Sequence, residues 1–172
     1  SSHRYKMVMP GFLGFYDTFD SAAAEASRRF SNLLEGYTYE PRSPLFRADV
    51  AALGGEVDGI TQADRCAMSF DSVSEYVGAL YVVDGSVLGG MTMNKALTRN
   101  PELVEKGGKT YWRWCQRNGL NHWRSTLKLV EQAWQRGSNT AAITAGAIRT
   151  FSSMHDCLKG VEITANKVKA DE

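Results

Sequence analysis

The chain has 172 residues, a formal net charge of +1, 43% hydrophobic residues and 23% charged residues. This length is enough for one domain with a real core. The near-zero net charge does not favour binding to nucleic acid or to an anionic membrane surface. No apolar run approaches the roughly 20 residues of a membrane span. Three widely spaced cysteines, Cys66, Cys115 and Cys157, indicate reduced thiols. We therefore expect a single cytoplasmic domain, residues 1–172.

The first part of the chain has the apolar spacing of helices, with residues recurring every three or four positions. The expected helices are Tyr5 to Phe19, Ser21 to Leu34 and Leu45 to Leu53. Pro10-Gly11 should bend or interrupt the first of them, because proline lacks a backbone N–H. Gly36 should end the second and Gly54-Gly55 the third. Residues 56–70 are expected to form a loop or only a brief helix.

The second part is also helical. Ser72 and Glu75 have the spacing of a capping box, which predicts a helix from there to about Thr98, before the breaker Asn100-Pro101. The later expected helices are Lys109 to Gln116, Leu120 to Gln135 and Thr140 to Leu158. Asn118-Gly119 should separate the first two, and the charged tail 167–172 should fray. No strand alternation longer than a few residues occurs, so the sequence predicts an all-α domain of about seven helices.

The helix that starts near Glu75 is unusual because it contains Gly78, Gly85, Gly89 and Gly90. Each interior glycine costs about 1 kcal/mol relative to alanine. Gly85 and Gly89 should lie on one face, with Ser86 and Gly90 beside them. Two explanations are open: close packing of a neighbouring helix, or a planar cofactor lying against the backbone. The spacing alone does not choose between them.

Other candidate residues give weaker signals. The three histidines, His3, His122 and His155, have no zinc-ligand spacing with cysteine or carboxylate residues. His155 lies beside Met154 and Leu158, which favours a structural role. No phosphate loop, nucleophile elbow or dinucleotide fingerprint is present. Arg113 and Arg117 alternate with aromatic residues, so they could hold the carboxylates of a large apolar ligand.

Four segments carry a resemblance to a known family. Residues 80–90, Leu-Tyr-Val-Val-Asp-Gly-Ser-Val-Leu-Gly-Gly, resemble the distal helix of bacterial heme oxygenases. They are most similar to the type found beside bacteriophytochromes, with the pattern Leu-Tyr-Val-Leu-Glu-Gly-Ser-x-Leu-Gly-Gly. Residues 4–16, 44–54 and 108–123 are similar to the family's second helix, its Leu-x-x-Asp-Leu-x-x-Leu-Gly segment and its Gly-x-x-Phe-Phe segment. The matches follow the family's order and cover most of the chain.

The resemblance implies a helical bundle in which heme lies between a proximal helix and a kinked, glycine-rich distal helix. Gly85, Ser86 and Gly89 would form the catalytic distal pocket, and Tyr81 and Gly90 would add contacts to heme. Arg113 and Arg117 would be the cations for its carboxylates. Animal-type members have an aspartate where this chain has Ser86. The resemblance therefore implies that a distal water network, rather than a carboxylate, would assist the reaction here.

The implied reaction is cleavage of heme, as substrate and cofactor, to biliverdin, iron and carbon monoxide. It uses dioxygen and an external electron donor such as a ferredoxin or a flavin reductase. In this type of enzyme, a phytochrome would be the acceptor of the bilin. Because heme itself activates oxygen, the role of the protein would be to position heme and to order water.

The chain departs from the family at the iron ligand. The proximal histidine of the family lies in a helix that precedes the segment matching Arg4-Tyr5, and His3 does not occupy that position. We therefore expect the proximal helix to be absent from this chain, and the residue that holds iron is unknown. Two alternatives to an enzyme follow: a non-catalytic protein of the same fold that binds heme or a bilin, and a helical interaction module whose glycines serve packing alone.

Overall fold

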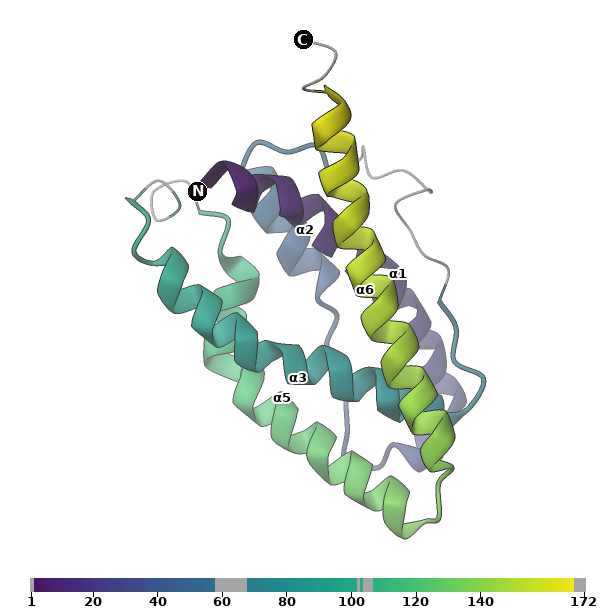
Figure 1. Ribbon diagram of the computed structural model, residues 1–172. Helices are drawn as coiled ribbons and strands as arrows, with labels where there is room; N and C mark the ends of the chain where they lie inside the picture. Colours follow the sequence, from purple (N-terminus) through teal and green to yellow (C-terminus); the bar gives the residue numbers. More distant parts are fainter. Residues whose placement is uncertain (1, 58–67, 102, 104–106, 169–172) are drawn as a thin grey trace.

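The computed structural model describes residues 2–57, 68–101, 103 and 107–168, and these ranges contain helices but no strand (Figure 1). The elements are α1 (Ser2–Arg29), the short 3-10 helix η1 (Ser31–Leu33), α2 (Ser43–Ala52), α3 (Val73–Leu97), α5 (Thr110–Gln135) and α6 (Thr140–Val168). The predicted all-α class is confirmed. Most of the predicted loop 56–70, with Cys66, lies outside the described residues, as does most of the tail.

Several predicted helix boundaries are wrong, and the described residues form five α-helices and a short 3-10 helix instead of about seven helices. α1 joins the two predicted helices Tyr5 to Phe19 and Ser21 to Leu34 and ends at Arg29, so Pro10 does not interrupt it. α5 runs without a break through Gly119. α6 continues past Gly160 to Val168. At Gly119 the reason is visible, because a Cβ there would lie 3.0 Å from the Cβ of Val87 in α3. The glycine therefore serves close packing between α5 and α3, and the packing outweighs its low helix propensity.

The helices pack around α3. Figure 1 shows α3 and α5 running side by side, with α6 crossing α3 and α1 lying next to α6. α2 is joined to α1 and α5 through the ring of Phe46, whose centroid lies 5.4 Å from Phe12, 4.9 Å from Tyr16 and 4.2 Å from Tyr111. Buried aromatic pairs at such distances contribute beyond their buried area. This cluster fixes the walls on which the candidate site is built.

The start of α3 is capped, although not entirely as predicted. The Ser72 hydroxyl accepts a hydrogen bond from the Glu75 backbone N–H at 3.2 Å. The Glu75 carboxylate accepts from the N–H of Asp71 instead of Ser72, at 3.0 Å. It also pairs with Arg149 of α6 at 2.7 Å. The capping carboxylate thus ties the first turn of α3 to α6, beside the point where the helices cross.

Two glycines allow that crossing. A Cβ on Gly78 would lie 1.9 Å from the carbonyl oxygen of Ile143, and a Cβ on Gly146 would lie 2.1 Å from the carbonyl oxygen of Glu75. Both distances are far below contact between atoms, and both neighbours are backbone atoms that cannot rotate away. For Gly78, therefore, close helix packing is the correct explanation of the missing side chain.

The buried tyrosines and one buried cysteine determine how the stability of the fold should change at alkaline pH. Burial raises the pKa of the tyrosines Tyr5, Tyr16, Tyr37, Tyr39, Tyr76 and Tyr111. It also raises the pKa of the Cys115 thiol to about 11. An acid whose pKa is higher in the folded state keeps its proton there longer than in the unfolded chain, so its contribution is complete at low pH and is lost as pH rises.

We therefore expect the free energy of unfolding to fall as pH rises above about 8.5, the pKa of an unfolded cysteine, and more steeply above about 10, that of an unfolded tyrosine. Urea unfolding between pH 7 and pH 11 measures this. The Tyr111→Phe variant, which cannot ionise at that position, should show a shallower decline. A free energy of unfolding that stayed level or rose up to pH 11 would contradict the prediction.

Candidate functional site

One face of α3 opens on a cavity of about 470 Å³, a size typical of small-molecule sites. Ser86, Gly89 and Gly90 line it from α3. The other walls come from four helices and are mostly apolar: Phe12 and Tyr16 of α1, Thr92 and Met93 of α3, Tyr111 and Trp112 of α5, and Met154 of α6. A cavity with these walls suits a large apolar ligand that has few polar atoms.

The two glycines at this cavity differ in their surroundings. A Cβ on Gly90 would lie 2.6 Å from the Cys115 sulfur, so this glycine is needed for packing against α5. A Cβ on Gly89 would meet no atom within 4 Å. Packing therefore does not explain the missing side chain at Gly89, and the backbone there is open to a ligand.

Four hydroxyl groups line this otherwise apolar cavity, those of Tyr16, Ser86, Thr92 and Tyr111. The hydroxyls of Tyr16 and Tyr111 lie 3.2 Å apart, and the Ser86 hydroxyl donates to the Val83 carbonyl at 2.7 Å. Burial raises the pKa of Tyr16 to about 12, despite hydrogen bonds from Tyr111 and Ser86 that lower it. Tyr16 therefore stays protonated to higher pH than an ordinary phenol, and its hydroxyl can donate a hydrogen bond. The sequence signal for it is a tyrosine at a core position, whose hydroxyl needs a partner.

Two other predicted site residues, Tyr81 and Gly85, lie next to Trp123 of α5 and do not line this cavity. A Cβ on Gly85 would lie 3.3 Å from the Trp123 ring. The rings of Tyr81 and Trp123 meet edge to face at 5.1 Å. The predicted shared face of Gly85 and Gly89 is thus divided, because an indole covers one glycine and leaves the other bare. The contacts to a ligand predicted for Tyr81 and Gly85 stay predictions.

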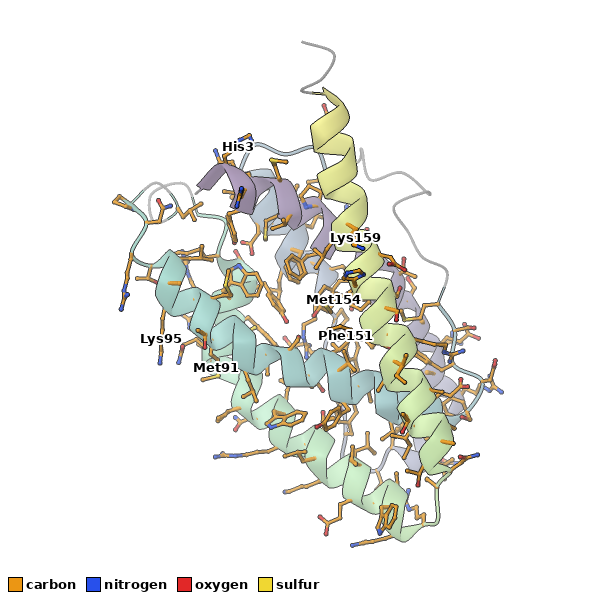
Figure 2. The ribbon with its side chains drawn as sticks, in the orientation of Figure 1. His3, Met91, Lys95, Phe151, Met154 and Lys159 are labelled. Carbon is orange, nitrogen blue, oxygen red and sulfur yellow. The ribbon has the colours of Figure 1, made fainter. Side chains whose placement is uncertain are left out.

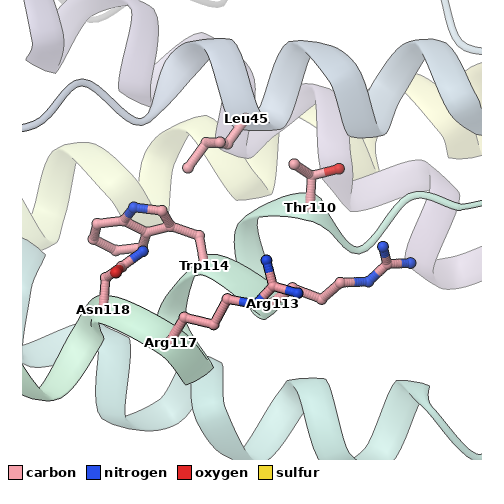
Figure 3. Close-up of a pocket in the computed structure, with 6 residues that line it drawn as sticks. All are labelled: Leu45, Thr110, Arg113, Trp114, Arg117 and Asn118. Atoms are coloured by element: carbon pink, nitrogen blue, oxygen red, sulfur yellow. The ribbon is translucent and has the colours of Figure 1, made fainter.

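Arg113 and Arg117 lie in a different place. They line a separate cleft of about 240 Å³ together with Leu45, Thr110, Trp114 and Asn118 (Figure 3). The structure brings the two arginines together, but none of the α3 residues Ser86, Gly89 and Gly90 is among the residues lining this cleft. The predicted role of the arginines toward carboxylates of a ligand stays a prediction.

A buried carboxylate, Asp84, anchors α3 just before Gly85 and Ser86; the resemblance implied that it flanks the ligand, whereas it points into the core. The Asp84 side chain is fully buried and pairs with the Arg42 guanidinium at 2.9 Å. It also accepts hydrogen bonds from the hydroxyls of Tyr37 and Thr126, each at 2.6 Å. Burial and the nearby carboxylate raise the pKa of Tyr37 far above its ordinary value. An aspartate directly after the apolar run 79–83 was the sequence signal for such a network.

A second, separate cavity has a volume of about 410 Å³. It is lined by Val8 and Phe12 of α1 and by His155, Leu158 and Lys159 of α6. Phe12 lines both cavities. The structural role expected for His155 is not supported, because 55% of its side chain is exposed.

The surface of α6 carries two large exposed apolar side chains, and neither lines one of these cavities. Phe151 is 66% exposed and Ile148 61% exposed. Figure 2 labels Phe151, Met154 and Lys159 along α6, with Met91 and Lys95 on α3. Of the α6 residues that the figure labels, Met154 lines the cavity on α3.

Two searches for other kinds of site give negative results. No helix in the described ranges is both long and apolar enough to cross a bilayer. In the same part of the chain, no three His, Cys, Asp or Glu side chains come together in a group that could hold a metal ion. A zinc-type site built only from protein ligands therefore has no candidate among these residues.

Comparison with known proteins gives one relevant relative. A curated heme oxygenase from Xanthomonas campestris pv. campestris (strain 8004) is 31% identical to this chain over 124 residues, which are 72% of this chain and 70% of that protein. No family model matches the chain, and no solved structure matches it significantly.

Proposed function

The chain belongs to the heme oxygenase family, and from that premise we propose that it binds heme and cleaves it oxidatively to biliverdin, iron and carbon monoxide. The observation that carries the proposal is the bare backbone of Gly89, which faces an apolar cavity and has no packing neighbour. A flat apolar ring can lie against such a backbone where any side chain would hold it off.

The residues at the cavity fit heme. Its walls are aromatic and thioether side chains, which suit the faces of a macrocycle. Its polar atoms are few and are hydroxyls, which suit bound water or dioxygen. When bound, heme supplies the iron that activates dioxygen, with electrons from an external donor such as a ferredoxin or a flavin reductase.

The chain's own residues would bind and orient heme and donate hydrogen bonds at its side. Gly89 lets the ligand approach α3, while Phe12 and Met154 exclude water from its apolar part. Tyr16, whose hydroxyl lies 3.2 Å from that of Tyr111, would donate a hydrogen bond toward the cavity, and Ser86 would hold water beside it. These hydroxyl groups would orient water in a mostly apolar site, so that water rather than a side chain would carry the proton.

Three finer assignments belong to the same proposal. We infer one heme-oxygenase-like domain over residues 1–172, of the type found beside bacteriophytochromes, and located in the cytoplasm. In that setting a phytochrome would accept the bilin product. The similarity of residues 80–90 to that group supports the assignment.

Hemin titration of this chain tests the proposal. Bound hemin should quench tryptophan fluorescence and give a sharp Soret band, and addition of ascorbate or of a ferredoxin system should produce the absorption spectrum of biliverdin. A broad spectrum of free hemin would refute binding. Sharp binding without biliverdin would identify a non-catalytic member of the family.

The Gly89→Leu variant gives a sharper prediction. A leucine there would project from α3 into the space that we assign to heme, so we expect hemin to bind at least about tenfold more weakly, a change of about 1.4 kcal/mol. The thermal midpoint should stay level or rise, because nothing lies within 4 Å of the new Cβ and leucine favours a helix over glycine.

Ala96→Leu is the matched control for this variant, because Ala96 is an exposed residue of the same helix and does not line the cavity. It should leave hemin binding unchanged. Equal hemin affinity of Gly89→Leu and the unmodified chain would show that the ligand does not use the bare backbone.

A further inference from the structure

We propose that two copies of this chain associate through an apolar stripe on α5, about a two-fold axis that passes beside Leu127. The two α5 helices would run antiparallel across this axis. The stripe consists of Leu120, Trp123, Leu127, Val130 and Trp134. None of these residues lines the cavity on α3, so the inference does not depend on the proposed function.

The stripe is exposed to an extent that is unusual for large apolar side chains. Trp134 is 68% exposed, Leu127 43% and Leu120 36%, while Trp123 and Val130 are partly buried. Figure 1 shows α5 at one side of the bundle, with α3 beside it. Several large apolar side chains in one row are typical of a surface that another protein covers.

The spacing of the stripe is that of a seam between two helices. Its five residues follow one another at intervals of three, four, three and four positions, which is the a/d repeat of coiled coils. The residues of α5 that are buried in the bundle, among them Gly119, Leu129 and Ala133, are different ones. The stripe is therefore a second apolar face, in addition to the face that packs inside the bundle.

The stripe is also symmetric about Leu127, as a two-fold axis requires. Leu120 precedes Leu127 by seven positions and Trp134 follows it by seven. In an antiparallel pair, each Leu120 would therefore meet the Trp134 of the other copy, and Leu127 would meet its own counterpart. An interface between two identical surfaces has to be complementary to itself. Tryptophan is among the residues that contribute most to such interfaces.

The charges along one side of the stripe are complementary to themselves as well. Arg124 and Glu131 are exposed and lie seven positions apart, which is about 10.5 Å along a helix and too far for an ion pair within one chain. Among the described residues neither forms an ion pair, and Glu131 accepts a hydrogen bond from Gln135 at 3.4 Å. Antiparallel pairing about Leu127 would place each Arg124 opposite the Glu131 of the other copy, so the axis would form two ion pairs.

α3 widens the apolar surface on the other side of the stripe. Tyr81 is 46% exposed and Leu88, seven positions further along α3, is 42% exposed. The ring of Tyr81 meets that of Trp123 edge to face at 5.1 Å. Stable interfaces bury about 1,200–2,000 Å² in total, and two helices from each copy provide more of this area than one helix alone.

The molar mass in solution tests the association. Size-exclusion chromatography with light scattering should give twice the 19.0 kDa of one chain. Leu127→Glu should give a monomer, because it would place two carboxylates against each other at the axis in an apolar surface. Phe151→Glu is the matched control, since Phe151 is 66% exposed on α6, and it should leave the dimer intact. Both variants should keep the circular dichroism of the unmodified chain, because both positions are exposed.

Charge reversal tests the antiparallel register. Arg124→Glu and Glu131→Arg each place like charges opposite one another in both pairs, so each should weaken self-association at least about tenfold at low salt. An equimolar mixture of the two variants should form a heterodimer, because both ion pairs are then restored across the interface. The double reversal within one chain should restore the homodimer for the same reason.

Three results would overturn the proposal: an unmodified chain that stays monomeric at its highest soluble concentration, a dimer that Leu127→Glu leaves intact, or single reversals whose mixture does not associate. In each case hemin titration of the unmodified chain would still decide the proposed function, because Arg124, Leu127 and Glu131 are not among the residues that line the cavity.

Discussion

Alanine in place of Gly78 is expected to lower the free energy of unfolding by about 3 kcal/mol or more. The new methyl group would lie 1.9 Å from the carbonyl oxygen of Ile143, and the next nearest atoms also belong to the backbone of α6. Side chains can rotate away from such a clash, but a helix backbone cannot. Either α6 moves away from α3 or the crossing is lost, and both outcomes break the tightest contact between the two helices.

Urea unfolding followed by circular dichroism measures the effect. Gly89→Ala is the matched control, because it makes the same change in the same helix where nothing lies within 4 Å. For Gly89→Ala we expect the free energy of unfolding to rise by up to about 1 kcal/mol, which is the difference in helix propensity between alanine and glycine. If the two variants were equally stable, the crossing would not depend on the missing side chain.

A second variant at the crossing tests the same geometry from the other helix. Gly146→Ala should also destabilise, since its Cβ would lie 2.1 Å from the Glu75 carbonyl oxygen. The double variant with Gly78→Ala should lose less than the sum of the two single losses, because once the helices have separated, the second methyl group meets no clash.

These variants separate the two explanations of the glycine-rich helix that the sequence left open. Packing is the explanation at some residues of α3, and the ligand explanation stays a prediction for one other. Gly78 and Gly90 are required by packing against α6 and α5, whereas Gly89 has no packing neighbour. Spacing along the sequence shows which glycines share a face, but it does not show which neighbouring helix covers that face. Only the tertiary structure distinguishes a covered glycine from a bare one.

The same limit explains which helix boundaries were predictable. Apolar periodicity placed the helices well, and the N-cap at Ser72 was found from its spacing to Glu75. The expected break at Gly119 does not occur, and Pro10, where a bend or an interruption was expected, does not interrupt α1. Those residues lower the intrinsic preference for helix, but packing of the surrounding helix against its neighbours outweighs a local cost of about 1 to 3 kcal/mol.

The candidate site was predictable in part for a related reason. Ser86, Gly89 and Gly90 line one cavity, whereas Arg113 and Arg117 line another cleft. The two groups lie on different helices, and no sequence spacing relates positions on two helices. Tyr16 and Asp84 were detectable in principle, because each puts a polar group in an apolar run and so implies a buried partner.

Removal of the Asp84 carboxylate should be among the most damaging changes in the chain. In Asp84→Ala, the Arg42 guanidinium would stay in the core without its charge partner, and Arg42 is 0% exposed. Breaking a buried ion pair in this way costs about 3–5 kcal/mol. The hydroxyls of Tyr37 and Thr126 would lose their acceptor as well. We expect the free energy of unfolding, measured with urea, to fall by at least about 3 kcal/mol.

A double-mutant cycle identifies the cause of that loss. Asp84→Ala combined with Arg42→Met removes both charges, so it should be less destabilised than the sum of the single variants, because no unpaired charge then stays buried. Arg47→Met, which breaks the pair with Asp17 where the arginine side chain is 43% exposed, should cost no more than about 1 kcal/mol. If the losses in free energy of unfolding at Asp84 and Arg42 simply add, the pair is not the source of the stability.

The buried pair also bears on function, since Asp84 immediately precedes Gly85-Ser86 and fixes the opposite side of α3. An Asp84→Asn variant that folds but binds hemin more weakly would show that the buried pair also sets the rotation of α3 toward the cavity.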